Sequence, residues 1–208
     1  MSKVFFSVTV SLDGFMAPEW PSDKQWLDQW LRLQDYVLHQ RFFRRNLKFG
    51  DDGETGVDNQ ILEETFNRTG VTIIGKRMFD AGEPSWPEEA PFHTPVFVLT
   101  KQKRDPWPRP GGTVFHFVND GIESALRQAR EVANGRDIRI GGGALTIQQA
   151  LNAGLVDEFH IAVAPVLLHA GLRLFDRLDA GRVEVELTES KPTPRVTHQR
   201  YRVSGGGA

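Results

Sequence analysis

Cysteine is absent from the 208 residues, and this absence excludes disulfide bonds, thiolate metal ligands and cysteine nucleophiles. No run of about 18 apolar residues occurs, so we expect neither a membrane-spanning helix nor an export signal. An excess of one charge sign is also missing, because the formal net charge is -2 and the pI is about 6.3. Nucleic acids and anionic membranes attract basic surfaces. The sequence therefore predicts a cytoplasmic protein that binds neither.

Length and composition fit one globular domain. Hydrophobic residues make up 39% of the chain and charged residues 25%, which is enough apolar material for a core and too little charge bias for disorder. A chain of this length can share one hydrophobic core. We expect a single domain over residues 1–203 and a disordered tail over residues 204–208, because nothing in SGGGA can be buried.

Segments with the composition of strands recur along the chain. The first, Val4 to Val10, is rich in Val, Phe and Thr and leads to Asp13-Gly14, which predicts a central strand. Similar runs predict further strands over residues 71–74, 96–99, 114–118 and 138–140. From Phe159 onward the pattern predicts a long strand and then an antiparallel pair over residues 182–190 and 195–203.

Apolar residues at helical spacing follow the first strand. Residues 22–38 predict one long amphipathic helix that starts with a capping box at Ser22 and Gln25. Residues 48–59 are acidic, glycine-rich and aperiodic, which predicts a loop. Asp58 is the predicted cap of a short helix that runs through Phe66.

Two further helices complete the alternation. Asp120 and Glu123 predict the cap of a helix that Gly135 closes, and residues 147–155 predict a helix that Gly154 ends. Strands that alternate with helices are typical of an α/β fold with helices on both faces of a mostly parallel sheet. The sequence therefore predicts three layers, with an antiparallel edge at the C-terminal end of the sheet.

Three consecutive glycines stand where a predicted strand becomes a helix. Gly141, Gly142 and Gly143 have no side chains, so the backbone can approach a pyrophosphate, and the next helix begins with free N–H groups and the positive end of its dipole. The alternative is a plain tight turn. The spacing G-x-G-x-x-G of the dinucleotide-binding fingerprint is not met.

Three other strand ends carry residues of similar kind. Residues 75–77 read Gly-Lys-Arg, Thr100-Lys101 offers a hydroxyl and a cation to a ribose phosphate, and Ser11 to Gly14 follows the first strand. In a sheet of this type ligands bind beyond the carboxyl ends of the strands. Each segment alone is equally explained by a turn or by solvated surface residues.

Four segments together resemble the dihydrofolate reductase-like family, which includes the C-terminal reductase domain of bifunctional riboflavin biosynthesis enzymes. They are SLDGFMA, IIGKRMFD, VFVLTKQ and IRIGGGALTIQQALNAGLVDEFHIAVAPVLLHAGLRLFD. The likeness covers almost the whole chain and is most specific in the last block. It implies a fold with a central eight-stranded sheet and an NADPH site across the strand ends.

The resemblance also implies a role for each segment. The pyrophosphate would lie at Gly141, Gly142, Gly143, Ala144 and Leu145. The 2′-phosphate and the adenosine would lie near Gly75, Lys76, Arg77, Met78, Thr100 and Lys101. The nicotinamide would lie against residues 8–14, with Val10 and Gly14 as contacts. Asp13 would then be the catalytic residue, and it would position the carboxamide of the nicotinamide or relay a proton.

The sequence departs from the family pattern in two places. The family often has Gly-Arg-x-Thr where residues 75–78 read Gly-Lys-Arg-Met, so a threonine hydroxyl is missing. A preference for NADPH over NADH then rests on Arg77 and Lys101. Dihydrofolate reductases also carry a substrate-binding acid on the first helix, where only Asp28 and Asp35 are candidates by position. Folate is therefore disfavoured as the substrate.

Histidine and carboxylate patterns give little further chemistry. None of the six histidines pairs with another at the i, i+4 spacing of two ligands on one helix, so we predict no metal site. His160 lies within a predicted strand and is expected in the core or at the sheet edge. Glu54, Asp58, Glu63 and Glu64 form an acidic group, which supplies either a general acid with a raised pKa or a solvated face.

Three hypotheses remain. The first is an NADPH-dependent reductase that transfers a hydride to a small heterocyclic or sugar-derived substrate, as the 5-amino-6-(5-phosphoribosylamino)uracil reductase of riboflavin biosynthesis does. The second is a nucleotide-binding module of the same fold without catalysis, and the third is a structural dimerisation domain. The resemblance also implies a homodimer with the apolar C-terminal strands as the contact.

Overall fold

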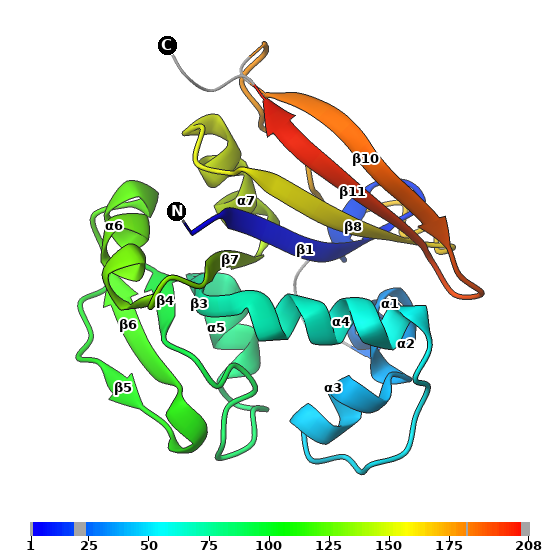
Figure 1. Cartoon of the computed structure of the whole chain (residues 1–208), viewed down its shortest axis with the longest axis horizontal. Coiled ribbons are helices and arrows are strands. Elements are labelled where there is room, and N and C mark those ends of the chain that lie inside the picture. The colour runs from blue at the N-terminus through cyan, green and yellow to red at the C-terminus, as the bar shows by residue number, and fades with distance from the viewer. Residues whose placement is uncertain (1, 19–23, 182, 205–208) are drawn as a thin grey trace.

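The computed structural model describes residues 2–18, 24–181 and 183–204, and these residues form a central sheet with helices on both faces (Figure 1). The strands are β1 (Val4–Ser11), β2 (Phe15–Ala17), β3 (Thr69–Gly75), β4 (Val96–Leu99), β5 (Trp107–Pro108), β6 (Val114–Val118), β7 (Asp137–Gly142), β8 (Glu158–Ala164), β9 (Leu172–Arg173), β10 (Glu184–Pro192) and β11 (Thr197–Ser204). The helices are α1 (Lys24–Leu33), α2 (Asp35–Leu38), α3 (Arg41–Asn46), α4 (Val57–Arg68), α5 (Lys76–Gly82), α6 (Ile122–Val132) and α7 (Ala144–Asn152).

The main sheet has the strand order β10-β11-β8-β1-β7-β3-β4-β6-β5. The six strands from β8 to β6 run parallel to their neighbours, while β11, β10 and β5 are antiparallel. This is the predicted α/β fold, with its mostly parallel sheet and antiparallel C-terminal edge. The described sheet has nine strands instead of eight, because the two-residue β5 adds to β6 at the far edge.

Apolar residues on both faces of the sheet attach the two helical layers. On β1, Val4, Phe6, Val8 and Val10 join the cluster that includes Leu126 of α6 and Ile147 of α7. The opposite face packs against the other helices. There Leu33 and Tyr36 of the α1–α2 region contact Ala162 and Ala164, and Phe79 of α5 packs with Ile74, Val96 and Phe115. None of the described helices is long and apolar enough to cross a membrane.

The long helix predicted over residues 22–38 was wrong in its extent. Its described part divides into α1 and α2 with a break at Gln34, and a further helix, α3, follows a second break at Gln40, whose backbone is extended. The buried Gln40 explains the second break, because its side-chain amide donates to the Tyr36 carbonyl at 2.6 Å. Local hydrogen bonding of this kind competes with continued helix. Ser22, the predicted start of the capping box, lies outside the described residues.

Two predicted caps were also wrong. The residue that caps α4 is Gly56, and Asp58 points instead to the sheet. The residue that caps α6 is Gly121, while Asp120 accepts a hydrogen bond from the Ser124 hydroxyl. At the C-terminal end, Ser204 belongs to β11 and not to the predicted tail, whose residues 205–208 lie outside the described part of the chain.

Candidate functional site

The carboxyl ends of the parallel strands meet along one edge of the sheet. Ser11 pairs with Ala164, Ile74 pairs with both Gly142 and Val98, and Gly75 pairs with Leu99. The loops that leave β1, β7, β3 and β4 therefore begin side by side. This is the edge at which sheets of this type bind ligands.

The three glycines at the end of β7 have different surroundings. A Cβ on Gly141 would lie 2.9 Å from Thr72 Cγ2 and 3.1 Å from Ile74 Cγ2, so β3 leaves no room for a side chain there. Gly142 has φ +121°, and a Cβ on it would lie 2.8 Å from Met16 Cε. At Gly143 a Cβ would meet no atom of the described residues within 4 Å. Among residues 2–18, 24–181 and 183–204, nothing therefore fills the space in front of Gly143, whereas Gly141 is needed for packing.

The open space at Gly143 leads to the first turn of α7. None of the described side chains caps this helix, and its N-cap residue is Gly143 itself. Backbone N–H groups in the first turn of an uncapped helix are available to an anion, and the helix dipole favours negative charge there. Gly75 lies against the same turn, because a Cβ on it would come within 2.5 Å of Thr146 Oγ1. The glycine junctions of β7 and β3 thus form one continuous backbone surface.

The basic residues after β3 and β4 differ in how they are held. Lys76 forms an ion pair with Asp80 one turn along α5. The Thr100 hydroxyl accepts a hydrogen bond from the Gln102 N–H group at 3.1 Å, and Lys101 is exposed. Met78 Sδ lies 3.5 Å from a Cβ built on Gly142, so the thioether that replaces the expected threonine borders the glycines. Roles for these residues in cofactor binding stay predictions.

Asp13 anchors the loop that follows β1. Its carboxylate accepts hydrogen bonds from the Ser11 hydroxyl at 2.6 Å and from the N–H groups of His169 at 2.8 Å and Leu168 at 3.2 Å. Burial raises the pKa of Asp13, but these hydrogen bonds outweigh burial and lower the pKa to about 2. The carboxylate is therefore ionised at neutral pH and already engaged in the loop, which favours a positioning role over a proton relay.

Four further residues were predicted to contact the cofactor at this edge, and they differ in burial and in the element to which they belong. Val10 is buried in the core, so its side chain faces away from the edge. Gly14 has φ +85° and takes part in the turn closed by its N–H bond to the Ser11 carbonyl. Ala144 is buried at the start of α7, and Leu145 beside it is half-buried.

Sequence reasoning missed three residues that build this edge. Arg173 donates to the Asp13 carbonyl at 2.8 Å and lies over the Phe15 ring, and Gln148 of α7 donates to the carbonyls of Arg173 and Leu174. Arg104 lies over Trp107 and two phenylalanine rings and pairs with Glu83. Arg104 could have been found from the basic residues that follow Thr100 in the sequence. No sequence neighbour of Gln148 indicates its partners.

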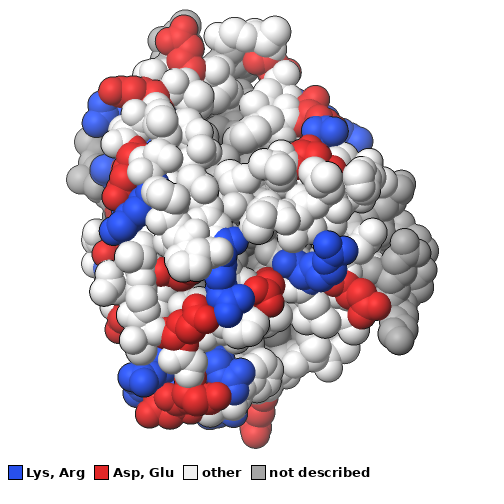
Figure 2. All heavy atoms as spheres, turned by 90° about the vertical axis from the view of Figure 1, so that its right-hand side faces the viewer, with Lys and Arg blue, Asp and Glu red and all other residues white. Residues whose placement is uncertain are grey.

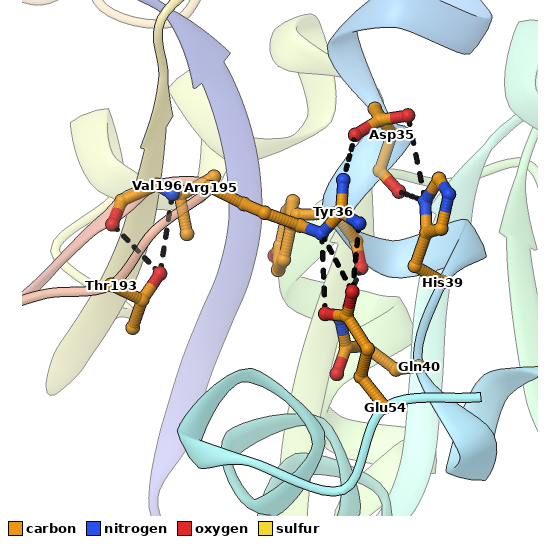
Figure 3. Close-up of polar contacts among 8 residues, drawn as sticks. All are labelled: Asp35, Tyr36, His39, Gln40, Glu54, Thr193, Arg195 and Val196. Carbon is orange, nitrogen blue, oxygen red and sulfur yellow. Dashed lines mark hydrogen bonds and ion pairs between the residues drawn. The ribbon is translucent and has the colours of Figure 1, made fainter.

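The hairpin of β10 and β11 closes one end of the edge through an ion-pair cluster (Figure 3). Arg195, in the turn of the hairpin, donates to both Glu54 oxygens, at 2.7 and 3.2 Å, and to Asp35 at 2.7 Å. Gln40 also donates to Glu54, at 3.3 Å. On the face drawn in Figure 2, acidic and basic side chains are interspersed in the same way. Glu54 and Asp35 are therefore engaged in structure, and Asp28 is exposed on α1.

A cavity of about 250 Å³ opens on the α4 side of the sheet, away from this edge. Its lining includes Ser7, Thr65, Arg68, His160 and Arg200. Ser7 lies four residues before the end of β1, so the cavity is about 13 Å from the carboxyl edge along the strand. The cavity and the glycine edge are separate features.

Comparison with known proteins gives one family model and several similar chains. The model described as the RibD C-terminal domain matches residues 2–198. The uncharacterized protein YwjB of Bacillus subtilis (strain 168) is 23% identical over 176 residues, which cover 85% of this chain and 84% of YwjB. The uncharacterized protein YyaP of the same organism is 41% identical over 59 residues, a match that spans only 31% of YyaP and 28% of this chain.

Solved structures establish the same fold at low sequence identity. A putative riboflavin biosynthesis protein from Shewanella sp. PV-4 superposes with a TM-score of 0.65 at 20% identity, covering 98% of this chain and 99% of that one. A deaminase/reductase from Thermotoga maritima gives 0.60 at 12% identity, covering 98% of this chain and 57% of its own. Dihydrofolate reductase from Enterococcus faecalis, complexed with NADP(H), gives 0.55 at 12% identity over 97% and 96% of the two chains.

Proposed function

Because the chain belongs to the RibD C-terminal domain family, we propose that it is a reductase that binds NADPH at the glycine edge and reduces a C=N or C=O carbon of a small substrate. The observation that carries this proposal is the open, uncapped first turn of α7 at Gly143, beside Gly75 and the loops of β1 and β4. A dinucleotide needs such an extended edge, with bare backbone at its pyrophosphate.

The residues present fit this cofactor. Gly143 and the first-turn N–H groups of α7 would hold the pyrophosphate, since no side chain in the described part of the chain fills the space before Gly143. The adenosine end of the cofactor would lie near Arg77, Lys101 and Arg104. The nicotinamide would lie against residues 10–14. When bound, NADPH supplies the hydride from C4 of its nicotinamide. The protein's part is then to orient the reacting groups and to exclude water.

Asp13 has a positioning role in this proposal. Its ionised carboxylate holds the loop after β1 against residues 168–173, and Arg173 and Gln148 connect that loop to α7. The nicotinamide and pyrophosphate parts of the site are thereby fixed relative to each other. A carboxylate with a pKa of about 2 has no proton to give at neutral pH, so we assign the proton to bound water.

For the substrate we propose a heterocycle or sugar-derived compound related to ribosylaminopyrimidines. The support is the name of the Thermotoga maritima protein, a 5-amino-6-(5-phosphoribosylamino)uracil reductase joined to a deaminase, of which this chain spans 57%. The ion pair between Asp35 and Arg195 also leaves that acid engaged, which agrees with the argument against folate.

A titration with NADPH and NADH tests the cofactor, followed by nicotinamide fluorescence and by thermal shift. Gly143→Ala is the informative variant, because a Cβ there clashes with none of the described residues and yet occupies the proposed pyrophosphate space. We expect saturable NADPH binding that this variant weakens without loss of fold. No binding by the wild-type protein overturns the reductase. Tight binding without turnover of ribosylaminopyrimidines or related carbonyl compounds favours the non-catalytic module.

We also propose that the protein forms a homodimer through the apolar side of β10 and β11. All nine residues of β10 are exposed, and Val185 and Leu187 retain 51% and 53% of their accessible surface. In Figure 1 this hairpin stands at the edge of the sheet, and none of the described helices is drawn over β10. Light scattering of a Leu187→Lys variant tests the proposal, with the exposed Ser190→Lys as the control. A wild-type monomer at micromolar concentration would contradict it.

A further inference from the structure

One buried chain of hydrogen bonds joins four elements across the sheet and the α4 layer. The Ser7 hydroxyl lies 2.9 Å from His160 Nδ1, His160 Nε2 lies 2.9 Å from His198 Nδ1, and His198 Nε2 lies 2.7 Å from Asp58 Oδ1. The two imidazoles and the carboxylate are each less than 8% exposed. The chain therefore links β1, β8 and β11 to the first turn of α4.

The partners at each nitrogen determine where the protons lie. An ionised Asp58 only accepts, so His198 Nε2 carries a proton, and a neutral His198 then accepts at Nδ1. His160 Nε2 must donate to it, which leaves His160 Nδ1 to accept from the Ser7 hydroxyl. With both rings neutral, every hydrogen bond in the chain is therefore satisfied in one direction, from Ser7 to Asp58.

The same geometry accommodates one added proton and not two. When the pair takes up one proton, His198 donates a hydrogen bond from both nitrogens. His160 then accepts at Nε2 and carries its own proton on Nδ1, which donates to the Ser7 oxygen. Two added protons would place N–H groups of two cations opposite each other at 2.9 Å. The bond between His160 and His198 cannot survive that state.

The surroundings make added protons costly. Burial lowers the pKa of His160 to about 3. Burial also lowers the pKa of His198, although the negative charges of Asp58 and Glu189 act in the opposite direction and raise it. Arg200 of β11 and Arg139 of β7 add positive charge beside the rings. From α2, Tyr36 packs edge-on against His198 and stays neutral, because burial raises its pKa to about 12.

Solvent can reach one end of the chain. Ser7 and His160 both belong to the lining of the 250 Å³ cavity, so protons exchange with the first ring without unfolding. At the other end of the chain, the hydrogen bond between His198 and Asp58 holds the start of α4 against β11. The segment that enters α4 carries Glu54, which Arg195 holds from the turn of the β10–β11 hairpin (Figure 3).

We propose that Ser7, His160, His198 and Asp58 form a pH-sensitive latch that fastens α4 to β11 and opens when the second imidazole proton enters. Opening separates the first turn of α4 from the β10–β11 hairpin while the parallel core of β3 and β4 stays paired. The latch is independent of the proposed catalysis, since its residues lie on the α4 face and not at the glycine edge.

Hydrogen exchange read by mass spectrometry between pH 7 and pH 4.5 tests the latch in the full chain. We expect the opening constant of peptides from α4 and β11, taken relative to peptides from β3, to rise by up to about tenfold per pH unit for each proton taken up. His160→Gln removes one of the two imidazoles and is expected to reduce this rise to that of a single proton, because burial lowers the pKa of His198 as well. His116→Gln is the matched control, because His116 on β6 also has a pKa lowered by burial but stands outside the chain.

Two further readouts keep the proposal testable if His160→Gln folds poorly. Ser7→Ala retains both imidazoles and must retain the acid-dependent opening. Nitrogen NMR of the wild-type protein at pH 7 must find Nδ1 unprotonated and Nε2 protonated in both rings. A rise in exchange that His160→Gln leaves intact, equal exchange in α4 and β3, or the opposite tautomers would each overturn the latch.

Discussion

The three consecutive glycines differ at the level of single atoms. Gly141 faces the side chains of β3, Gly142 has a backbone angle that favours glycine, and Gly143 faces open space. A motif that looks uniform in sequence thus combines a packing requirement, a conformational requirement and a candidate binding surface. Only the last of these concerns a ligand.

Alanine substitutions are expected to separate these roles. Gly141→Ala forces a methyl group to 2.9 Å from Thr72 Cγ2, and overpacking of this kind destabilises by about 1–3 kcal/mol. Gly143→Ala is expected to leave the free energy of unfolding within about 0.5 kcal/mol, because surface changes without new contacts cost little. Denaturant unfolding of both variants checks this. Equal destabilisation by the two would refute the difference in their environments.

Asp13→Asn is expected to loosen the loop after β1. An asparagine offers one acceptor oxygen where the carboxylate accepts three hydrogen bonds, so we expect a loss of about 1–2 kcal/mol at pH 7. The folded pKa of about 2 lies below the unfolded value of 3.8, so this contribution is complete above pH 4 and fades as the pH falls through 2. Unfolding at pH 7 and pH 3 measures it.

The control for this change is Asp28→Asn, which removes an exposed carboxylate from α1. We expect no measurable loss of stability there at either pH. A pH-independent effect of Asp13→Asn would show that its carboxylate charge is not what holds the loop.

At the level of elements, the Arg195 cluster fastens the β10–β11 hairpin to α2 and to the loop before α4. Arg195→Ala removes hydrogen bonds to two carboxylates, and partly exposed ion pairs contribute about 0.5–1 kcal/mol. We expect a loss of that size that shrinks at high salt, because ions screen surface charges. Arg45→Ala, whose pair with Asp51 is far more exposed, is expected to cost nothing measurable.

Elements with a clear local signal could be predicted from sequence. The strands over residues 96–99 and 114–118 have the predicted bounds, because β-branched and aromatic runs between turn residues specify them locally. The division of the predicted helix into α1 and α2 was not predictable, because Gln34 is compatible with helix and its side chain is held by Thr9 of the sheet. Asp58 was misassigned as a cap because its partner, His198, is far away in the sequence.

In the candidate site too, features with a local sequence signal could be predicted, whereas contacts between distant residues could not. The places of the glycine junctions and the Asp13 loop at strand ends could be predicted from sequence, because each follows a clear strand pattern, and their binding roles stay predictions. The hydrogen bonds that engage Asp13, Lys76 and Glu54 could not be predicted, since each depends on the tertiary placement of another element or on a rotamer.

At the scale of the whole molecule, cofactor binding should appear as added stability. A ligand present at 100 times its Kd stabilises the native state by about 2.7 kcal/mol when it does not bind the unfolded chain. For a chain of this size we expect NADPH to raise the Tm by about 5–10 °C. Scanning calorimetry with NADPH, NADH and no nucleotide measures this, and equal shifts for the two nucleotides would contradict the preference assigned to Arg77 and Lys101.

The position of β1 has a consequence for synthesis of the chain. β1 is translated before the other described strands, yet Val4 pairs with Ile138 of β7 and Ser11 with Ala164 of β8, so both of its neighbours are made more than 120 residues later. Until β7 leaves the ribosome, this apolar strand has no partner on either edge, and one edge stays unpaired until β8 follows. Unpaired strand edges are prone to aggregation, so the nascent chain is expected to depend on chaperones until both strands have been translated.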